Sequence, residues 1–215
     1  MYTGHPDQHF GHITYSQHGE DLMVANLFKL MRIDKPSYLD IGAHHPIHIS
    51  NTALLYSRGS RGVNIEANPM LMGAFDEHRP EDRNVCVAVG LSEEMADLHL
   101  YDETSGLNSL LGSEIPGGPK GSIRVVVVPL GWVIDTICGG IWPDFLSIDV
   151  EGMDFEILSG HHFLGSNKPK IICAEVRPHQ SAEWDEMMRW KGFRPICRMG
   201  ENMIFIERSR HVWPL

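Results

Sequence analysis

The stretch Tyr38-Leu39-Asp40-Ile41-Gly42-Ala43 decides the fold of this chain. It is a short apolar strand that ends in an acid and then a glycine. At the carboxyl end of a first parallel strand the chain must turn sharply beside a ligand, and glycine permits that close approach. We therefore expect Gly42 and Ala43 to line a cofactor site.

A second acid, Glu66, lies at the end of the next apolar run, 63–65, and follows Gly42 by 24 residues. In nucleotide-binding α/β folds, an acid about 20 residues beyond the glycine turn accepts hydrogen bonds from ribose hydroxyls. Either feature alone is common in purely structural turns. Together, at this spacing, they predict a nucleoside-containing cofactor held by Glu66.

Working outward, the chain alternates short apolar runs with segments long enough for helices, which predicts a mostly parallel sheet with helices on both faces. We expect strands at 38–41, 63–65, 85–89, 96–101, 125–128, 145–148 and 170–174, and helices near 20–31, 51–57, 70–78, 130–137, 155–164 and 182–191. The last two runs, 194–197 and 203–207, are joined by too few residues for a parallel crossover. The sequence thus predicts a Rossmann-like α/β fold whose seven-stranded sheet closes with an antiparallel hairpin.

Length and charge limit the remaining possibilities. A chain of 215 residues fits one domain, and we predict a polar segment over 1–15, a single domain over 16–208 and a tail over 209–215. The formal charge of −10 disfavours nucleic acid as a partner, because such binding needs clustered positive charge. No run is apolar enough for a membrane span or a signal peptide, so we expect a cytoplasmic location.

The glycine pattern separates the candidate cofactors. A dinucleotide-binding turn carries three glycines as G-x-G-x-x-G, so that helix amides can meet a pyrophosphate. Here Gly42 is followed by Ala43-His44-His45-Pro46-Ile47, with no second or third glycine, and no P-loop sequence occurs. A cofactor without phosphates, such as S-adenosylmethionine, therefore fits better than NAD or FAD.

Carboxylates gather after two later strands of the predicted sheet. Asp149 and Glu151 follow the run 145–148, and Glu175 ends the next strand. Because reactive groups gather at the carboxyl ends of strands in open α/β sheets, we expect Asp149 or Glu175 to activate an acceptor hydroxyl. His179 is a further candidate base, since imidazole titrates near neutral pH.

The same carboxylates allow two other interpretations. Asp149, Glu151 and Glu175 together could hold a Mg²⁺ ion, which prefers hard oxygen ligands. Alternatively, the acids cap the following helix and hydrogen-bond cofactor or backbone amides. The histidines at 44, 45 and 48 match no zinc spacing, and we expect them to line the cleft.

Four motifs in this chain resemble those of the FkbM family of methyltransferases. They are Ser16-Gln17-His18-Gly19-Glu20-Asp21, Tyr38-Leu39-Asp40-Ile41-Gly42-Ala43, Ile65-Glu66-Ala67-Asn68-Pro69 and Ile148-Asp149-Val150-Glu151-Gly152. The resemblance runs from about Ser16 to Ile206. It implies a Rossmann-like fold, S-adenosylmethionine as methyl donor and O-methylation, often of sugars or sugar-containing natural products.

The resemblance and the spacing together give a predicted cofactor site. It comprises Gln17, Glu20, Asp40, Gly42, Ala43, Glu66, Ala67, Ala88, Val89 and Asp149. Gln17 and Glu20, from the family's leading motif, are expected to close over the methionine end, and Ala88 and Val89 to form the edge of the adenine pocket. His48 departs from the pattern, because methyltransferases often have a glycine there.

The sequence therefore predicts an S-adenosylmethionine-dependent O-methyltransferase with a small, carbohydrate-like hydroxyl acceptor. A second subunit could complete the cleft in a homodimer. A noncatalytic S-adenosylmethionine or nucleotide binding module is one alternative; it would keep Gly42 and Glu66 but tolerate the loss of Asp149 and Glu175. An NAD-dependent oxidoreductase is a second alternative, which the missing glycines and the terminal hairpin oppose.

Overall fold

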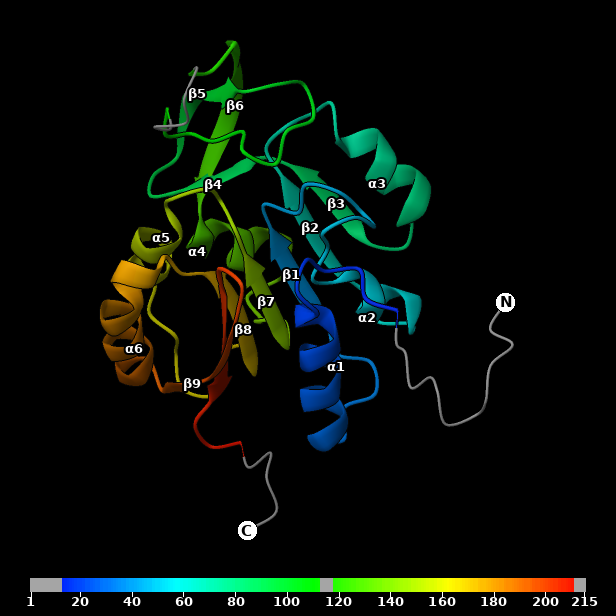
Figure 1. Ribbon diagram of the computed structural model, residues 1–215, viewed down its shortest axis with the longest axis vertical. Coiled ribbons are helices and arrows are strands. Elements are labelled where there is room, and N and C mark those ends of the chain that lie inside the picture. The colour runs from blue at the N-terminus through cyan, green and yellow to red at the C-terminus, as the bar shows by residue number, and fades with distance from the viewer. Residues whose placement is uncertain (1–12, 113–117, 211–215) are drawn as a thin grey trace.

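The central sheet of the molecule is built from the apolar runs of the sequence. The computed structural model describes residues 13–112 and 118–210, and its main sheet has the strand order β3-β2-β1-β7-β8-β10-β9 (Figure 1). The strands are β1 (Tyr38–Ile41), β2 (Gly62–Glu66), β3 (Arg83–Cys86), β7 (Phe145–Ile148), β8 (Ile171–Glu175), β9 (Phe193–Met199) and β10 (Asn202–Glu207).

Strand directions confirm the predicted fold class. β1 pairs in parallel with β2 and β7, β2 with β3, and β7 with β8. β10 is antiparallel to both β8 and β9, so the sheet ends in the predicted hairpin. The strand order reverses between β1 and β7, and open α/β sheets bind ligands at the carboxyl ends of the strands at such a switch point.

Helices cover both faces of the sheet (Figure 1). They are α1 (Glu20–Leu30), α2 (Ala53–Ser57), α3 (Met72–His78), α4 (Leu130–Trp132) continued by a π-helical turn (Val133–Ile137), α5 (Asp154–Gly160), a 3₁₀ turn (Pro178–Gln180) and α6 (Ser181–Trp190). Tyr38 packs in one core with α1 and α2, whereas Leu39 and Ile41 pack in another with α5 and α6. Burial on both faces explains why the central strands are apolar along their length.

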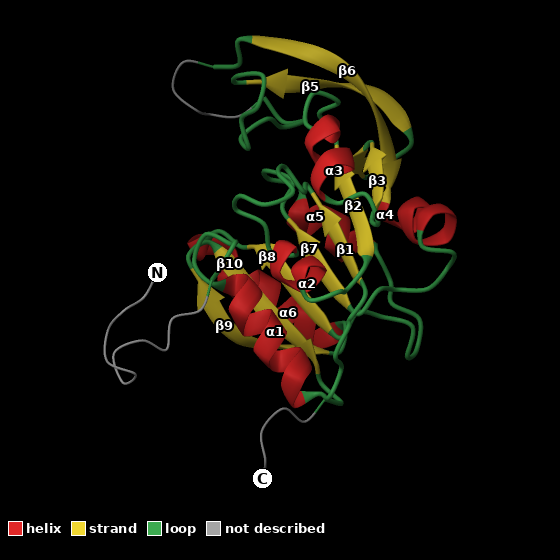
Figure 2. Cartoon of the chain, turned by 90° about the vertical axis from the view of Figure 1, so that its right-hand side faces the viewer, coloured by secondary structure: helices red, strands yellow, loops and turns green. Residues whose placement is uncertain are grey.

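A second sheet of three strands, β4-β6-β5, stands beyond the main sheet (Figure 2). It consists of β4 (Ala88–Gly90), β5 (Glu94–Leu100) and β6 (Gly121–Pro129). The single strand predicted over 85–89 is therefore wrong, because the chain leaves the main sheet after Cys86 and pairs with β6 from Ala88. A separate apolar cluster that includes Ala88, Leu98 and Val127 stabilises this departure.

One helix is shorter than its periodicity predicts. The helix expected over 155–164 ends at Gly160, and His161 already has an extended backbone. The Lys191 ammonium donates hydrogen bonds to the carbonyls of Ser159 and His161, at 3.1 and 2.5 Å. Lys191, directly after α6, thus satisfies two carbonyls that would accept backbone hydrogen bonds if α5 were longer.

Some predictions concern residues outside the described ranges. Most of the polar segment 1–15 and most of the tail 209–215 fall there. Within residues 13–112 and 118–210, no helix combines the length and apolar character that a membrane crossing requires.

Candidate active site

The turn after β1 accepts only glycine at position 42. Gly42 has a φ of 75°, and its N–H and that of Ala43 both donate to the carbonyl of Ile65 at 3.0 Å. A Cβ at position 42 would lie 1.7 Å from the carbonyl oxygen of Asp149. The absent side chain therefore lets the ends of β1, β2 and β7 meet at the switch point.

Glu66 joins the loops that follow β1 and β2. One carboxylate oxygen accepts the N–H of His44 and the other accepts the N–H of Asn68, each at 2.8 Å. The residue is 8% exposed, and burial raises the pKa of its carboxyl. Since each carboxylate oxygen has two lone-pair sites, the carboxylate can accept further hydrogen bonds from a ligand.

Between these loops lies a hollow that is partly open to solvent and has about 570 Å³ of free space, which we call the switch-point cavity. Among the predicted site residues, those that line it are Gly42, Glu66, Ala67, Ala88, Val89, Asp149 and Glu151. The cavity thus extends from the carboxyl end of β2, across β1, to that of β7.

The other wall comes from β5 and from the segment between β5 and β6. Leu98 of β5 lines the cavity, together with Ser105, Asn108 and Leu110 of that segment. The side-chain oxygen of Asn108 accepts a hydrogen bond from the N–H of Tyr101 at 2.9 Å, and its amide nitrogen donates one to the carbonyl of Asp102. The side chain therefore stabilises its own loop. No spacing rule in the sequence signals this wall, because it depends on where the second sheet lies.

Asp149 carries a buried oxygen into this cavity. Its Oδ1 has no hydrogen-bond partner within residues 13–112 and 118–210. Burial raises the pKa of the carboxyl well above its ordinary value, and the neighbouring carboxylates of Asp154, Glu175 and Glu151 raise it further. A buried polar atom without a protein partner needs an explanation, such as a bound ligand, an ordered water or a catalytic role.

Glu151 lies at the same end of the cavity in a left-handed backbone conformation, with a φ of 57°. Burial raises its pKa to about 7, and the carboxylates of Glu175, Asp154 and Glu201 add to the effect, while Arg177 opposes it. A titratable group with a strongly shifted pKa in a cavity is a functional-site candidate.

A smaller hollow of about 280 Å³, which we call the β8 hollow, lies next to this end of the cavity. It is lined by Gly152, Asp154, Phe155, Glu175, Arg177, Gln180 and Trp184. Burial raises the pKa of Glu175, as do Asp154 and Glu201. The indole Nε1 of Trp184 is buried and has no hydrogen-bond partner among the described residues. Glu175 therefore belongs to the β8 hollow and not to the wall of the switch-point cavity.

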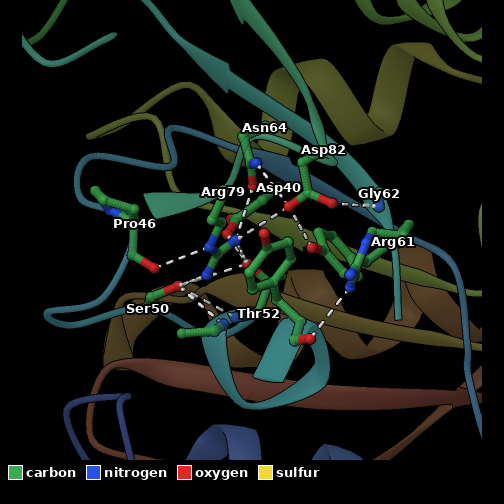
Figure 3. A network of polar contacts seen from close by, with 12 residues as sticks. Asp40, Pro46, Ser50, Thr52, Arg61, Gly62, Asn64, Arg79 and Asp82 are labelled. Atoms are coloured by element: carbon green, nitrogen blue, oxygen red, sulfur yellow. Dashed lines mark hydrogen bonds and ion pairs between the residues drawn. The ribbon is translucent and has the colours of Figure 1, made fainter. Parts of the chain in front are cut away.

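Asp40 lies beneath the cofactor loop instead of in the cavity. Its carboxylate accepts a hydrogen bond from Thr52 Oγ1 at 2.6 Å, and burial raises its pKa. Figure 3 shows that Thr52 in turn joins Asp40 to Arg79, whose guanidinium donates to Thr52 Oγ1 at 2.7 Å. Asp40 thus holds the loop after β1 from below.

Arg79 is the centre of this buried network, and sequence reasoning missed it. Its guanidinium donates to the carbonyl of Pro46 at 2.9 Å and to Ser50 Oγ at 2.9 Å, both in the loop after β1 (Figure 3). It also forms an ion pair with Asp82 at 3.8 Å. An arginine at the end of a helix is usually solvated, so only the tertiary structure identifies it.

The other predicted site residues lie away from both hollows. Ala43 is buried behind the turn, and Gln17 is exposed. Glu20 is fully buried, where it accepts the N–H of His18 at 2.8 Å and the Asn202 amide at 3.0 Å. His179 is exposed on the 3₁₀ turn.

The predicted Mg²⁺ site is not formed. No group of three His, Cys, Asp or Glu side chains in the described part of the chain is arranged to hold a metal ion. Glu175 faces the β8 hollow, whereas Asp149 and Glu151 line the switch-point cavity. The three carboxylates therefore do not converge on one point, and we derive no step through a metal.

The strand order and the cavity at the switch point define a Rossmann-like α/β protein of the methyltransferase class. Residues 40–195 match the family described as Methyltransferase FkbM domain. The chain belongs to this family and is an S-adenosylmethionine-dependent methyltransferase. This membership favours the enzyme over a noncatalytic binding module and over an NAD-dependent oxidoreductase.

Solved structures give only distant likenesses. A TehB-like S-adenosylmethionine-dependent methyltransferase from Corynebacterium glutamicum is 12% identical, with a TM-score of 0.44 and 88% of each chain covered. A precorrin-6y C5,15-methyltransferase from Geobacter metallireducens is 14% identical, with a TM-score of 0.42 over 86% of this chain and 85% of that one. None of the curated proteins matches the chain. These likenesses do not bear on the acceptor.

Proposed function

We propose that the enzyme transfers a methyl group from S-adenosylmethionine to a hydroxyl oxygen of a small, carbohydrate-like molecule. The observation that carries this proposal is the pairing of two neighbouring hollows: one lies at the switch point and is lined by Gly42 and Glu66, and the other is lined mainly by polar and charged side chains. The bound donor supplies an electrophilic methyl group, so the protein's main contribution is to bind and orient the two reactants and to exclude water.

The switch-point cavity suits the adenosine part of the donor. The Glu66 carboxylate lines the cavity and can accept hydrogen bonds from the hydroxyls of a ribose. Ala88, Val89 and Leu98 form an apolar wall for a flat base. Gly42 adds no side chain to the cavity wall, so a ligand can approach the backbone there. In this proposal the methionine end of the donor lies toward β7.

The β8 hollow suits a hydroxylated acceptor. Glu175 supplies hydrogen-bond acceptors, whereas Arg177 and Trp184 supply donors and Gln180 supplies both. A hydroxyl both donates and accepts, so such a mixed lining fits a carbohydrate-like molecule better than a purely apolar one. Asp149 or Glu175 takes the acceptor proton in this proposal, and His179 would require a movement of its turn to take part.

The remaining parts of the proposal concern the whole protein. A cytoplasmic location and a homodimer that completes the cleft stay predictions. Sedimentation velocity on the purified chain tests the homodimer. We expect a single species of twice the chain mass, and a monomer would contradict the prediction.

Mass spectrometry of reaction products tests the proposed chemistry. The protein is incubated with S-adenosylmethionine carrying an isotopically labelled methyl group and with a panel of simple glycosides and amines. We expect label in an ether methyl of a glycoside. Label only on nitrogen would contradict the acceptor class, and no label on any compound would contradict the activity under these conditions.

A further inference from the structure

Each end of the switch-point cavity carries a carboxylate, and the two carboxylates have different surroundings. Glu66, at the end of β2, is occupied by two backbone N–H groups. Glu151, beyond the end of β7, has no hydrogen-bond partner for its carboxylate in the described ranges. If adenosine binds at the β2 end, as the proposed function has it, the sulfur of the ligand lies toward Glu151.

The fold holds Glu151 firmly in an unfavourable backbone conformation. Its carbonyl accepts a hydrogen bond from Ser109 Oγ at 3.0 Å. The amides on either side, those of Val150 and Gly152, donate to the carboxylate of Asp154 at 3.0 and 3.3 Å. A residue other than glycine at φ 57° is strained, and this conformation persists only where the surroundings fix it.

The electrostatic surroundings of Glu151 are strongly negative. The charged or titratable groups that face it come from β7, α5, the end of β8 and the turn before β10: Asp149, Asp154, Glu175, Glu201 and Arg177. Arg177 is the single cation among these groups. The unpartnered Oδ1 of Asp149 lies at the same end of the cavity. Such a surplus of carboxylates favours a positively charged ligand group at this point.

We propose that the carboxylate of Glu151 distinguishes the methyl donor from its product by charge. S-adenosylmethionine carries a positive sulfonium, which an adjacent carboxylate attracts. Methyl transfer forms a bond between the acceptor oxygen and the methyl carbon and breaks the bond between that carbon and sulfur, so the electron pair stays on sulfur. The hydroxyl proton passes to the carboxylate of Asp149 or Glu175, as in the proposed function. S-adenosylhomocysteine has therefore lost the positive charge and is held less tightly, which speeds its release.

Calorimetric titration in mildly alkaline buffer tests this proposal without an acceptor. S-adenosylmethionine and S-adenosylhomocysteine are titrated into the wild-type protein, Glu151→Gln and the control Glu156→Gln, which removes an exposed carboxylate from α5. We expect Glu151→Gln to weaken S-adenosylmethionine binding about tenfold and S-adenosylhomocysteine binding by less than about twofold. The control should leave both affinities unchanged.

An equal loss for both ligands, or no loss for S-adenosylmethionine, would overturn the role of Glu151. If Glu151→Gln does not fold, the wild-type protein is titrated with sinefungin, which carries an ammonium group in place of the methylsulfonium. Sinefungin and S-adenosylmethionine should then bind about tenfold tighter than S-adenosylhomocysteine, and equal affinities overturn the proposal. If neither sulfur ligand binds the wild-type protein, the proposed function itself fails.

Discussion

At the scale of single residues, Gly42 carries the tightest geometric constraint of the site. We expect Gly42→Ala to destabilise the protein by about 3 kcal/mol, because a Cβ would meet the carbonyl of Asp149 and the backbone has a positive φ. The variant should also lose cofactor affinity, since relief of the clash moves the cavity wall. Thermal unfolding and titration with S-adenosylhomocysteine measure the two effects.

The matched control is Gly73→Ala in α3. A Cβ at this position meets no atom within 4 Å, and its φ is not positive. Alanine in a helix is favoured over glycine by about 1 kcal/mol. The control should therefore be as stable as the wild-type protein or slightly more stable, and a similar loss in both variants would refute the argument.

Arg79 should be the most costly side chain to remove from the buried network. Arg79→Met leaves Asp82 without its ion-pair partner and Ser50 and Pro46 without a donor. Breaking a buried pair from one side costs about 3 to 5 kcal/mol. Urea unfolding measures this loss. Arg58→Met, at an exposed position, should change stability by less than about 0.5 kcal/mol; similar values for the two variants would contradict the prediction.

At the residue scale, the spacing rule brought Gly42 and Glu66 together, and the structure places both in the walls of the cavity. Their contact with a cofactor stays a prediction. Glu20 does not line the cavity, because Asn202 from the far end of the chain binds its carboxylate. The importance of Arg79 and the backbone of Glu151 depend on tertiary contacts, which leave no local pattern in the sequence.

At the scale of elements, one carboxylate ties the starts of three strands. Asp144, just before β7, accepts hydrogen bonds from the Ser37 N–H at 2.9 Å and from the Lys170 ammonium. Burial alone would raise the pKa of Asp144, but the bonds from Lys170 and Ser37 outweigh it and hold the pKa below its ordinary value. The starts of β1, β7 and β8 are joined in this way.

The lowered pKa of Asp144 predicts a pH-dependent stability. A depressed folded-state pKa gives stability above the unfolded-state pKa, and this stability is lost as pH falls through the folded value. We expect Asp144→Asn to cost about 1 kcal/mol near neutral pH, a figure reduced for solvent screening. This difference from the wild-type protein should vanish as the solution becomes strongly acidic.

Urea unfolding at several pH values measures this difference. Asp34→Asn removes an exposed carboxylate and serves as the control, which should leave the pH profile of stability unchanged. A constant difference between the wild-type protein and Asp144→Asn at every pH would contradict the assigned role of Asp144.

Strands were predictable where a continuous apolar run had the length of a strand buried on both faces. β1, β7 and β8 are continuous apolar runs buried on both faces, and each lies within one residue of its predicted bounds. The run 85–89 was predicted as one strand because β-propensity does not reveal a change of partner. Only the pairing of β4 with β6 divides it.

At the scale of the whole molecule, the order of the strands in the sheet brings residues from separate sequence motifs into one site. Gly42, Glu66 and Asp149 are far apart in the sequence, but β1, β2 and β7 are neighbours in the sheet. The terminal hairpin and the alternation of strands and helices were enough to predict this architecture. The second sheet was not predicted, and only the structure shows how it supports the cavity wall between β5 and β6.

The central claim, that the switch-point cavity binds S-adenosylmethionine through Glu66, is tested most directly by calorimetric titration. S-adenosylmethionine, S-adenosylhomocysteine and NAD are titrated into the wild-type protein, Glu66→Ala and the exposed control Glu77→Ala, with circular dichroism to check the fold. We predict saturable binding of both sulfur ligands and none of NAD, with binding lost in Glu66→Ala and kept in Glu77→Ala. Binding of NAD alone, or sulfur-ligand binding that a folded Glu66→Ala retains in full, would contradict it.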